Sequence, residues 1–248
     1  MKSANHLIAL ATLLAVGFVF GPSCRNLSTS TSGPAPTTDV SADNPPKPVE
    51  KDIAGDYSTT GTNPDGKGEY KADLTITKHG EVFQFSWASG GNEYDGVGVV
   101  NGDHAAVSYT DGKDGKGCGV ILYQIKEDGT LQGKSGYWGV NEAEVETARR
   151  TSGSGLEGTY SIKGTNPNGK DYSGDLTVSK AGEGYTFKWN ADQALQGFGI
   201  RAGNMIAVGF GGKQCSFVGY DIKEDGTLDG QWGSAASKTF GTEVAKRK

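Results

Sequence analysis

The chain has 248 residues, with 24 Lys and Arg against 29 Asp and Glu, which gives a formal net charge of −5 at pH 7. No cluster of Lys and Arg forms a basic face, and this argues against nucleic acid or an anionic membrane surface as a partner. The chain contains 40 glycines and few extended helical patterns, so the composition also argues against a helical fold.

The first 23 residues have the pattern of an export signal. Lys2 supplies a positive charge, residues 7–20 form an almost unbroken apolar stretch, and small residues precede Cys24. Such a segment is too short for a membrane span and is typical of a signal peptide. A small residue before a cysteine also resembles a bacterial lipoprotein signal, in which Cys24 would be lipidated; ordinary cleavage after Ser23 is the alternative. We therefore expect an exported protein, either a membrane-anchored lipoprotein or a secreted or periplasmic one.

Residues 24–51 form the next segment, which is rich in Ser, Thr, Pro and Asp. This composition buries too little apolar surface to offset the entropy of ordering the chain. We expect a disordered tether that holds a globular part away from the membrane surface. The only membrane contact expected is through the lipid anchor.

The remainder of the chain is a duplication. The segment Gly-Thr-Asn-Pro-Asp-Gly-Lys at 61–67 returns as Gly-Thr-Asn-Pro-Asn-Gly-Lys at 164–170, and Ile-Lys-Glu-Asp-Gly-Thr-Leu at 125–131 returns unchanged at 222–228. A period this long indicates a duplicated structural unit rather than a short solenoid repeat. The predicted parts are a first β repeat at 52–150, a flexible linker at 151–155 and a second β repeat at 156–248.

Strict alternation of apolar and polar residues predicts half-buried β-strands in both copies. The pattern is clean over 74–77 and 83–87 of the first copy and over 176–179 and 185–189 of the second. Only residues 141–150 have a briefly helical pattern. The apolar residues expected to face the core of the first copy are Leu74, Ile76, Phe83, Phe85 and Trp87.

The turns between these patterns define the predicted fold class. Asp-Gly pairs at 128–129 and 225–226 lie between strand patterns, which is the strongest short signal for a β-hairpin. About six to eight short strands fit in each copy, at the spacing typical of sandwiches and barrels. We predict an all-β fold with two tandem copies of an antiparallel meander, each a small barrel or sandwich. The alternative is one barrel shared by both copies.

Two cysteines, Cys118 and Cys215, occupy matching positions in the copies. In an oxidising compartment an even number of cysteines permits a disulfide. The alternative is two separate small packed residues, which we favour because equivalent positions meet only if the copies face each other about a pseudo-twofold axis. Leu122 and Phe217 lie near these cysteines on the side opposite the predicted core. This outer face is apolar enough to predict contact between the repeats.

The chain resembles two families on these motifs. The Gly-Thr-Asn-Pro-x-Gly repeat, with its Leu-Thr-Val strand and Glu-Asp-Gly-Thr-Leu hairpin, is similar to a family of exported bacterial repeat proteins that is sometimes labelled fibronectin-binding. This resemblance covers most of residues 53–248. The opening Leu-x-Gly-x-Tyr of the second repeat is also similar to the Leu-x-Gly-x-Trp start of avidin-type and lipocalin-type barrels. Tyr57 and Tyr160 replace that Trp, so the resemblance implies a barrel and carries over no ligand residue.

Residues with catalytic or metal-binding chemistry occur singly rather than in both copies. His79 and His104 have Ala181 and Met205 as counterparts, and Cys118 has no histidine near it in sequence. A general base or metal site built into the duplicated unit is expected in both copies or as a cluster. We therefore expect no catalytic residues, no metal, no cofactor and no enzyme activity.

Four tryptophans are the candidate ligand contacts. Trp87 and Trp189 share the core side of their strands and are primarily core candidates, whereas Trp138 and Trp232 could plug a barrel end or line a cavity mouth. Two hypotheses follow. The first is a non-catalytic binding or adhesion module of the cell envelope with an unknown protein partner. The second is a carrier of a small apolar ligand inside a barrel, and a cavity lined by Trp would favour it.

Overall fold

The structure is a computed structural model that describes residues 50–166, 168–212 and 215–248. The predicted signal peptide, Cys24 and most of the predicted tether lie outside the described residues. Within them the chain forms sixteen β-strands and one short 3-10 turn, η1 (Pro64–Gly66), which confirms the all-β fold class. No helix in this part of the chain is long and apolar enough to cross a membrane.

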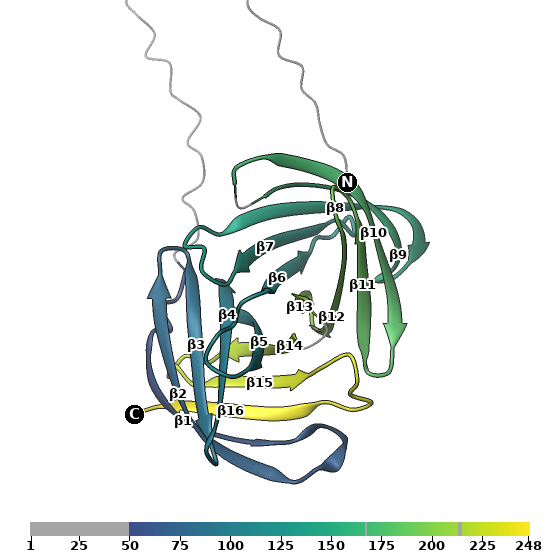
Figure 1. The fold of residues 1–248 in the computed structure, drawn as a ribbon. Coiled ribbons are helices and arrows are strands. Elements are labelled where there is room, and N and C mark those ends of the chain that lie inside the picture. Colours follow the sequence, from purple (N-terminus) through teal and green to yellow (C-terminus); the bar gives the residue numbers. More distant parts are fainter. Residues whose placement is uncertain (1–49, 167, 213–214) are drawn as a thin grey trace, which may run out of the picture. The chain divides into compact units, whose positions relative to one another are not determined.

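The strands close into two antiparallel barrels. Barrel A has the order β1-β16-β15-β14-β5-β4-β3-β2, and Figure 1 shows the last strands of the chain (yellow) beside the first ones (blue). Its strands are β1 (Gly55–Thr62), β2 (Glu69–His79), β3 (Val82–Ser89), β4 (Asn92–Asn101), β5 (His104–Asp111), β14 (Ser216–Ile222), β15 (Leu228–Gly233) and β16 (Gly241–Arg247).

Barrel B has the order β10-β11-β12-β13-β6-β7-β8-β9 and is built from the middle of the chain, drawn teal and green in Figure 1. Its strands are β6 (Cys118–Ile125), β7 (Leu131–Tyr137), β8 (Glu144–Ser154), β9 (Glu157–Thr165), β10 (Asp171–Ala181), β11 (Gly184–Asn190), β12 (Ala194–Ala202) and β13 (Met205–Gly211). Two barrels are therefore present, as the duplication predicts.

The division between barrels does not follow the division between repeats. Strand β5 pairs with β14 and strand β6 pairs with β13, so the chain crosses to the other barrel after the fifth strand of each repeat. Each barrel consequently contains five strands of one repeat and three of the other. The predicted domains at 52–150 and 156–248 are sequence repeats, but neither forms a barrel by itself.

Two local expectations are wrong. Residues 151–155, expected to be a flexible linker, continue β8 to Ser154 and turn directly into β9, because Ser152 pairs with Thr159 after a bulge. The briefly helical pattern at 141–150 also becomes part of β8 from Glu144 onward. Here the pairing with β7 and β9 outweighs a weak local helical preference.

The barrel interiors hold the predicted core. Leu74, Ile76, Phe83, Phe85 and Trp87 are all buried inside barrel A, which confirms the side assigned to them from alternation. A third apolar cluster lies on the outer faces of the barrels. It confirms the predicted apolar contact, and its side chains include Val97, Val99, Leu122, Phe198, Ile200 and Phe217. Because this cluster packs barrel against barrel, the contact is between barrels rather than between intact repeats.

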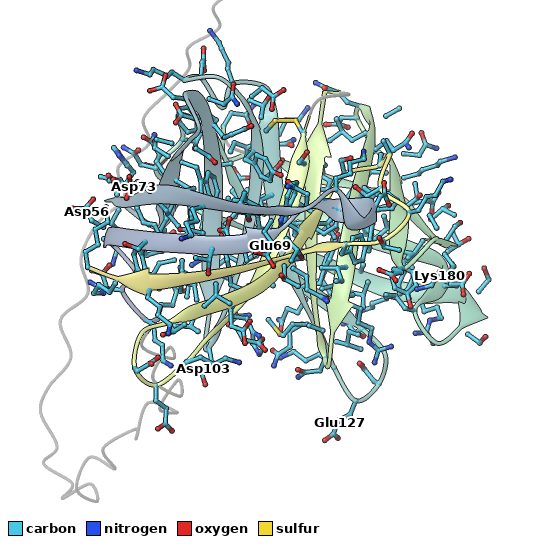
Figure 2. All side chains as sticks on the ribbon, turned by 90° about the horizontal axis from the view of Figure 1, so that it is seen from below. Asp56, Glu69, Asp73, Asp103, Glu127 and Lys180 are labelled. Carbon is cyan, nitrogen blue, oxygen red and sulfur yellow. A yellow bond between two sulfur atoms is a disulfide. The ribbon has the colours of Figure 1, made fainter. Side chains whose placement is uncertain are left out.

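The two crossover segments lie side by side, where a disulfide joins Cys118 to Cys215. Figure 2 shows this bond in yellow between the two barrels. The amide of Gly212 in one segment donates to the carbonyl of Gly117 in the other. The favoured expectation of two separate cysteines is therefore wrong. Strand exchange brings equivalent positions of the repeats together about a pseudo-twofold axis, which was the condition for a disulfide.

Candidate ligand-binding cavities in the barrel mouths

A buried glutamate with the same neighbours occupies the interior of each barrel. In barrel B, five adjacent strands contribute one residue each to a row of directly paired cross-strand neighbours. In order, these residues are Tyr123, Gly133, Glu146, Gly164 and Tyr172. Residues directly opposite one another across strands share a face of the sheet. Both tyrosines therefore reach over a glycine toward the carboxylate between them.

Glu146 accepts three hydrogen bonds from neutral donors. The hydroxyl of Tyr123 donates to Oε1, the hydroxyl of Tyr172 donates to Oε2 at 2.6 Å, and Nε1 of Trp189 donates to Oε1 at 3.3 Å. A Cβ at Gly164 would lie 2.5 Å from the Tyr172 ring, so only glycine allows this tyrosine to lie across the neighbouring strand.

Barrel A repeats the arrangement. Its row is Tyr220, Gly230, Glu243, Gly61 and Tyr70, on strands β14, β15, β16, β1 and β2. The hydroxyls of Tyr220 and Tyr70 donate to Glu243, the latter at 2.6 Å, and Nε1 of Trp87 donates to Glu243 at 3.1 Å. The repeats thus duplicate this Glu-Tyr-Tyr-Trp cluster, once inside each described barrel.

Burial controls the ionisation of these clusters. Desolvation raises the pKa of Glu146 and of Glu243, although the three donated hydrogen bonds partly oppose it. Desolvation and the neighbouring glutamate also raise the pKa of Tyr70 and Tyr172. The phenols therefore remain protonated donors at physiological pH.

Each cluster forms the floor of an open cavity with aromatic walls. The cavity of barrel B, here called cavity B, measures about 580 Å³ and is lined by Glu146, Trp189, Phe210, Tyr137, Trp138 and Tyr172, among others. The cavity of barrel A, cavity A, measures about 290 Å³ and is lined by Glu243, Trp87, Tyr94, Tyr109, Trp232 and Tyr70, among others. Both volumes are near or within the range of small-molecule sites.

Two substitutions between the repeats contribute to the difference between the cavities. Ser135 of barrel B and Trp232 of barrel A are equivalent positions, since Ser135 pairs with Ile121 and Trp232 pairs with Val218. Cavity A therefore contains an indole where cavity B contains only a hydroxymethyl group. Glu144 in β8 corresponds to Gly241 in β16, two residues before the buried glutamate in each strand. Cavity B is thus larger and has a second buried carboxylate beside it.

Glu144 is a buried acid that has no partner in the described part of the chain. Its exposed fraction is 9%, and it makes no hydrogen bond or ion pair with any residue that the structure describes. Burial raises the pKa of Glu144 from 4.5 to about 7. Its charge in turn helps to raise the pKa of Tyr137 and Tyr172, both of which line cavity B.

The raised pKa makes Glu144 a source of pH-dependent instability. The folded state binds its proton more tightly than the unfolded state, so the resulting stabilisation is complete below the unfolded value near 4.5 and is lost as pH rises through about 7. We expect Glu144→Gln to raise the free energy of unfolding by about 1–2 kcal/mol at pH ~8, after allowance for screening by water, and to change little at pH ~4. Urea titrations at both pH values measure this, with exposed Glu142→Gln as the control; equal shifts at both pH values would contradict the assignment.

The structure places all four candidate tryptophans at the cavities. Trp138 and Trp189 line cavity B, and Trp87 and Trp232 line cavity A. Trp87 and Trp189 are also core residues, each 7% exposed. Trp138 is not the register counterpart of Trp232; it packs over Gly115, where a Cβ would lie 2.4 Å from the indole.

Sequence reasoning missed the glutamates. Glu146 precedes Thr-Ala and Glu243 precedes Val-Ala near the end of each copy, and alignment of the repeats would have shown an acid at both positions. The expectation that candidate catalytic residues occur singly was argued from histidines and a cysteine, and it overlooked this duplicated acid. Each glutamate lies on the inward side of an alternating segment, at 144–148 and at 241–245, and this was the available signal.

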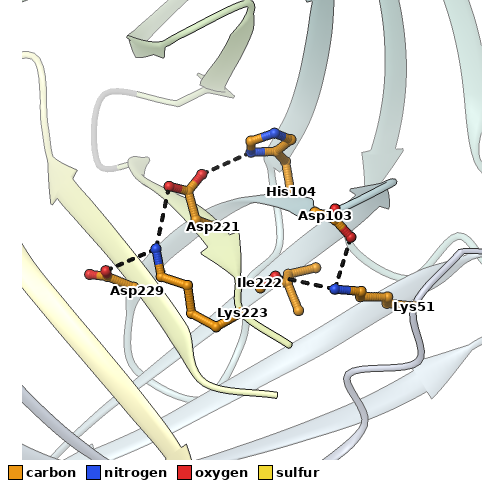
Figure 3. Close-up of polar contacts among 7 residues, drawn as sticks. All are labelled: Lys51, Asp103, His104, Asp221, Ile222, Lys223 and Asp229. Carbon is orange, nitrogen blue, oxygen red and sulfur yellow. Dashed lines mark hydrogen bonds and ion pairs between the residues drawn. The ribbon is translucent and has the colours of Figure 1, made fainter. Parts of the chain in front are cut away.

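His104 belongs to a different polar group, in a groove between the barrels. Figure 3 shows Nδ1 of His104 paired with Asp221 at 2.9 Å, and Lys223 reaching Asp221 and Asp229 at 3.8 and 3.2 Å. These side chains are all partly exposed, and such surface pairs contribute little energy. Among the described residues, no group of three or more His, Cys, Asp and Glu is placed to hold a metal ion.

Comparison of the chain with protein-family models, with curated proteins and with solved structures finds no match.

Proposed function

We propose that this protein is a non-catalytic binding protein that takes a small organic molecule into the mouth of each barrel. The observation that carries the proposal is the duplicated Glu-Tyr-Tyr-Trp cluster at the floor of an open, aromatic-walled cavity. An apolar cavity with a few convergent polar groups is the usual form of a small-molecule site. The cavities favour the carrier hypothesis over recognition through surface loops alone.

The chemistry of the clusters supports binding rather than catalysis. Each glutamate is held by two phenols and an indole, and none of these donors is a strong base or nucleophile at neutral pH. The raised pKa of Tyr70 and Tyr172 keeps the phenols protonated. Such groups orient a ligand through hydrogen bonds and ring contacts.

Titration with the neutral fluorescent probe N-phenyl-1-naphthylamine tests the proposal. We expect the full chain to bind the probe, and Ser135→Trp to weaken binding in cavity B at least about tenfold because it introduces the indole that narrows cavity A. The reverse change, Trp232→Ser, is expected to strengthen binding in cavity A. Val145→Trp adds the same side chain to the outer face of β8, where Val145 is 65% exposed, and serves as the control. Probe binding that is absent, or that Ser135→Trp leaves unchanged, would refute the proposal for cavity B.

We also propose that the protein acts outside the cytoplasm. The disulfide between Cys118 and Cys215 supports this location, because disulfides persist mainly in oxidising compartments. The export pattern at residues 1–23 supports it independently. Fractionation tests the anchor: we expect the wild-type protein to remain with the membranes and Cys24→Ala to become soluble. If both remain soluble, the protein is exported without a lipid.

A further inference from the structure

We propose that cavity B binds an organic ammonium ion, with its N–H groups held at Glu146 and Glu144 and its hydrocarbon part against the aromatic walls. This inference rests on the proposed function and names the class of ligand for one of its two sites. Four features of the cavity carry it: the direction of its hydrogen bonds, its charge, its walls and its difference from cavity A.

The floor of cavity B presents hydrogen-bond acceptors. The hydroxyl proton of Tyr172 and the indole proton of Trp189 are both directed to Glu146, so these donors are already used. What Glu146 and Tyr172 still present toward the cavity is the lone pairs of a carboxylate and a phenol. A ligand that matches this floor must bring its own donors, as an ammonium group does.

No buried cation among the described lining residues balances the charge of the cavity. Among the described residues that line it, the charged ones are Glu146, Lys170 and Asp192, and Lys170 lies at the exposed rim, 3.9 Å from Asp192. Glu144 adds a second buried carboxylate, on the same side of β8 as Glu146, because alternate residues of a strand face the same way and Val145 points outward. A buried carboxylate is costly without a cation, and a bound ammonium ion would supply one.

Glu144 is the observation that distinguishes a ligand site from a structural network. Glu146 has three partners and would serve as a packed polar core group without any ligand. Glu144 is nine-tenths buried beside Tyr137 and Tyr172, has no partner among the described residues and destabilises the fold at neutral pH. Functional sites commonly contain groups, such as an unpaired buried acid, that lower the stability of the fold.

The walls suit the hydrocarbon part of an organic cation. Trp189 and Tyr137 both pack against Phe210, with ring centroids 5.5 Å apart in each case, and all three line the cavity. Aromatic faces attract cations, most strongly when water is excluded. Cavity A has similar rings and Glu243, but Gly241 stands where barrel B has Glu144, and Trp232 reduces the space. The other carboxylate that lines cavity A, Asp111, is exposed to water. We therefore expect cavity B to be the stronger cation site.

Calorimetric titration of the full chain with 2-phenylethylamine and with 2-phenylethanol tests the inference, because the two probes have similar size and differ in charge. We expect the ammonium probe to bind at least about tenfold more tightly than the alcohol at neutral pH. Glu144→Gln is expected to reduce the affinity for the amine about tenfold and to leave the affinity for the alcohol unchanged. This variant should fold, since it removes a destabilising charge. Glu142→Gln, an exposed position two residues earlier, is the matched control for lost charge.

The outcomes separate this inference from the proposed function. The ammonium assignment would be overturned by equal affinity for amine and alcohol, or by an amine affinity that Glu144→Gln does not change. In either case, binding of the neutral naphthylamine probe would still support a small-molecule site. Failure of all three probes to bind would overturn both. An equal loss of amine affinity in Glu142→Gln would show only long-range attraction by surface charge and would also overturn the assignment.

Discussion

Replacement of Trp189 by alanine is expected to lower the free energy of unfolding by about 3–5 kcal/mol. The indole is only 7% exposed, and its ring lies 5.9 Å from Phe187 and 5.5 Å from Phe210, centroid to centroid. The change also removes one of three donors to Glu146 and leaves that buried carboxylate less well satisfied. Equilibrium denaturation in urea, followed by circular dichroism so that the missing tryptophan does not alter the signal, measures the loss.

Two further variants separate the components of this effect. Trp189→Phe keeps an aromatic ring but has no N–H, so we expect a smaller loss, of about 1–2 kcal/mol, from the missing hydrogen bond. Trp138→Ala, which removes a half-buried indole from the rim of the same cavity, controls for loss of aromatic area. A loss below about 1 kcal/mol for Trp189→Ala would match an ordinary surface position and remove Trp189 from the core.

The parts of the fold that depend on local pattern were predictable. Alternation at 83–87 and 185–189 fixes which side chains face inward, and the structure buries Phe85, Trp87, Phe187 and Trp189 accordingly. The exchange of strands was not predictable in this way. Whether the chain turns back after Asp111 or crosses to the other barrel depends on pairing between β5 and β14, more than 100 residues apart in sequence. Both arrangements satisfy the same alternation.

The candidate site likewise has residues that local sequence pattern could identify and residues that it could not. The tryptophans were identifiable because large aromatic residues on the inward side of a barrel strand either fill the core or line its mouth. The glutamates were not, since the significance of Glu146 depends on register: it lies between Gly133 and Gly164, and the tyrosines that hold it come from strands two positions away on either side. Neither spacing nor composition reveals a row that runs across five strands.

Removal of the disulfide, through Cys118→Ala combined with Cys215→Ala, is expected to lower the free energy of unfolding by about 2–4 kcal/mol. The bond joins residues 97 positions apart, so it restricts a long loop in the unfolded chain. It also joins the two segments where the chain crosses between barrels, next to the hydrogen bond from Gly212 to Gly117. Its loss therefore acts at the connection between the barrels rather than within either one.

Reduction of the wild-type protein provides the control for this prediction. Urea denaturation of wild type in the presence of a reductant should show nearly the same loss as the double variant, whereas the double variant should not respond to the reductant. Because Cys118 is 4% exposed and lines cavity B, the reduced protein is also expected to bind the naphthylamine probe less tightly if the crossover segments separate. A double variant as stable as oxidised wild type would contradict the prediction. It would mean that the apolar contact between the barrels holds the crossover segments together without the covalent bond, through residues such as Leu122 and Phe217.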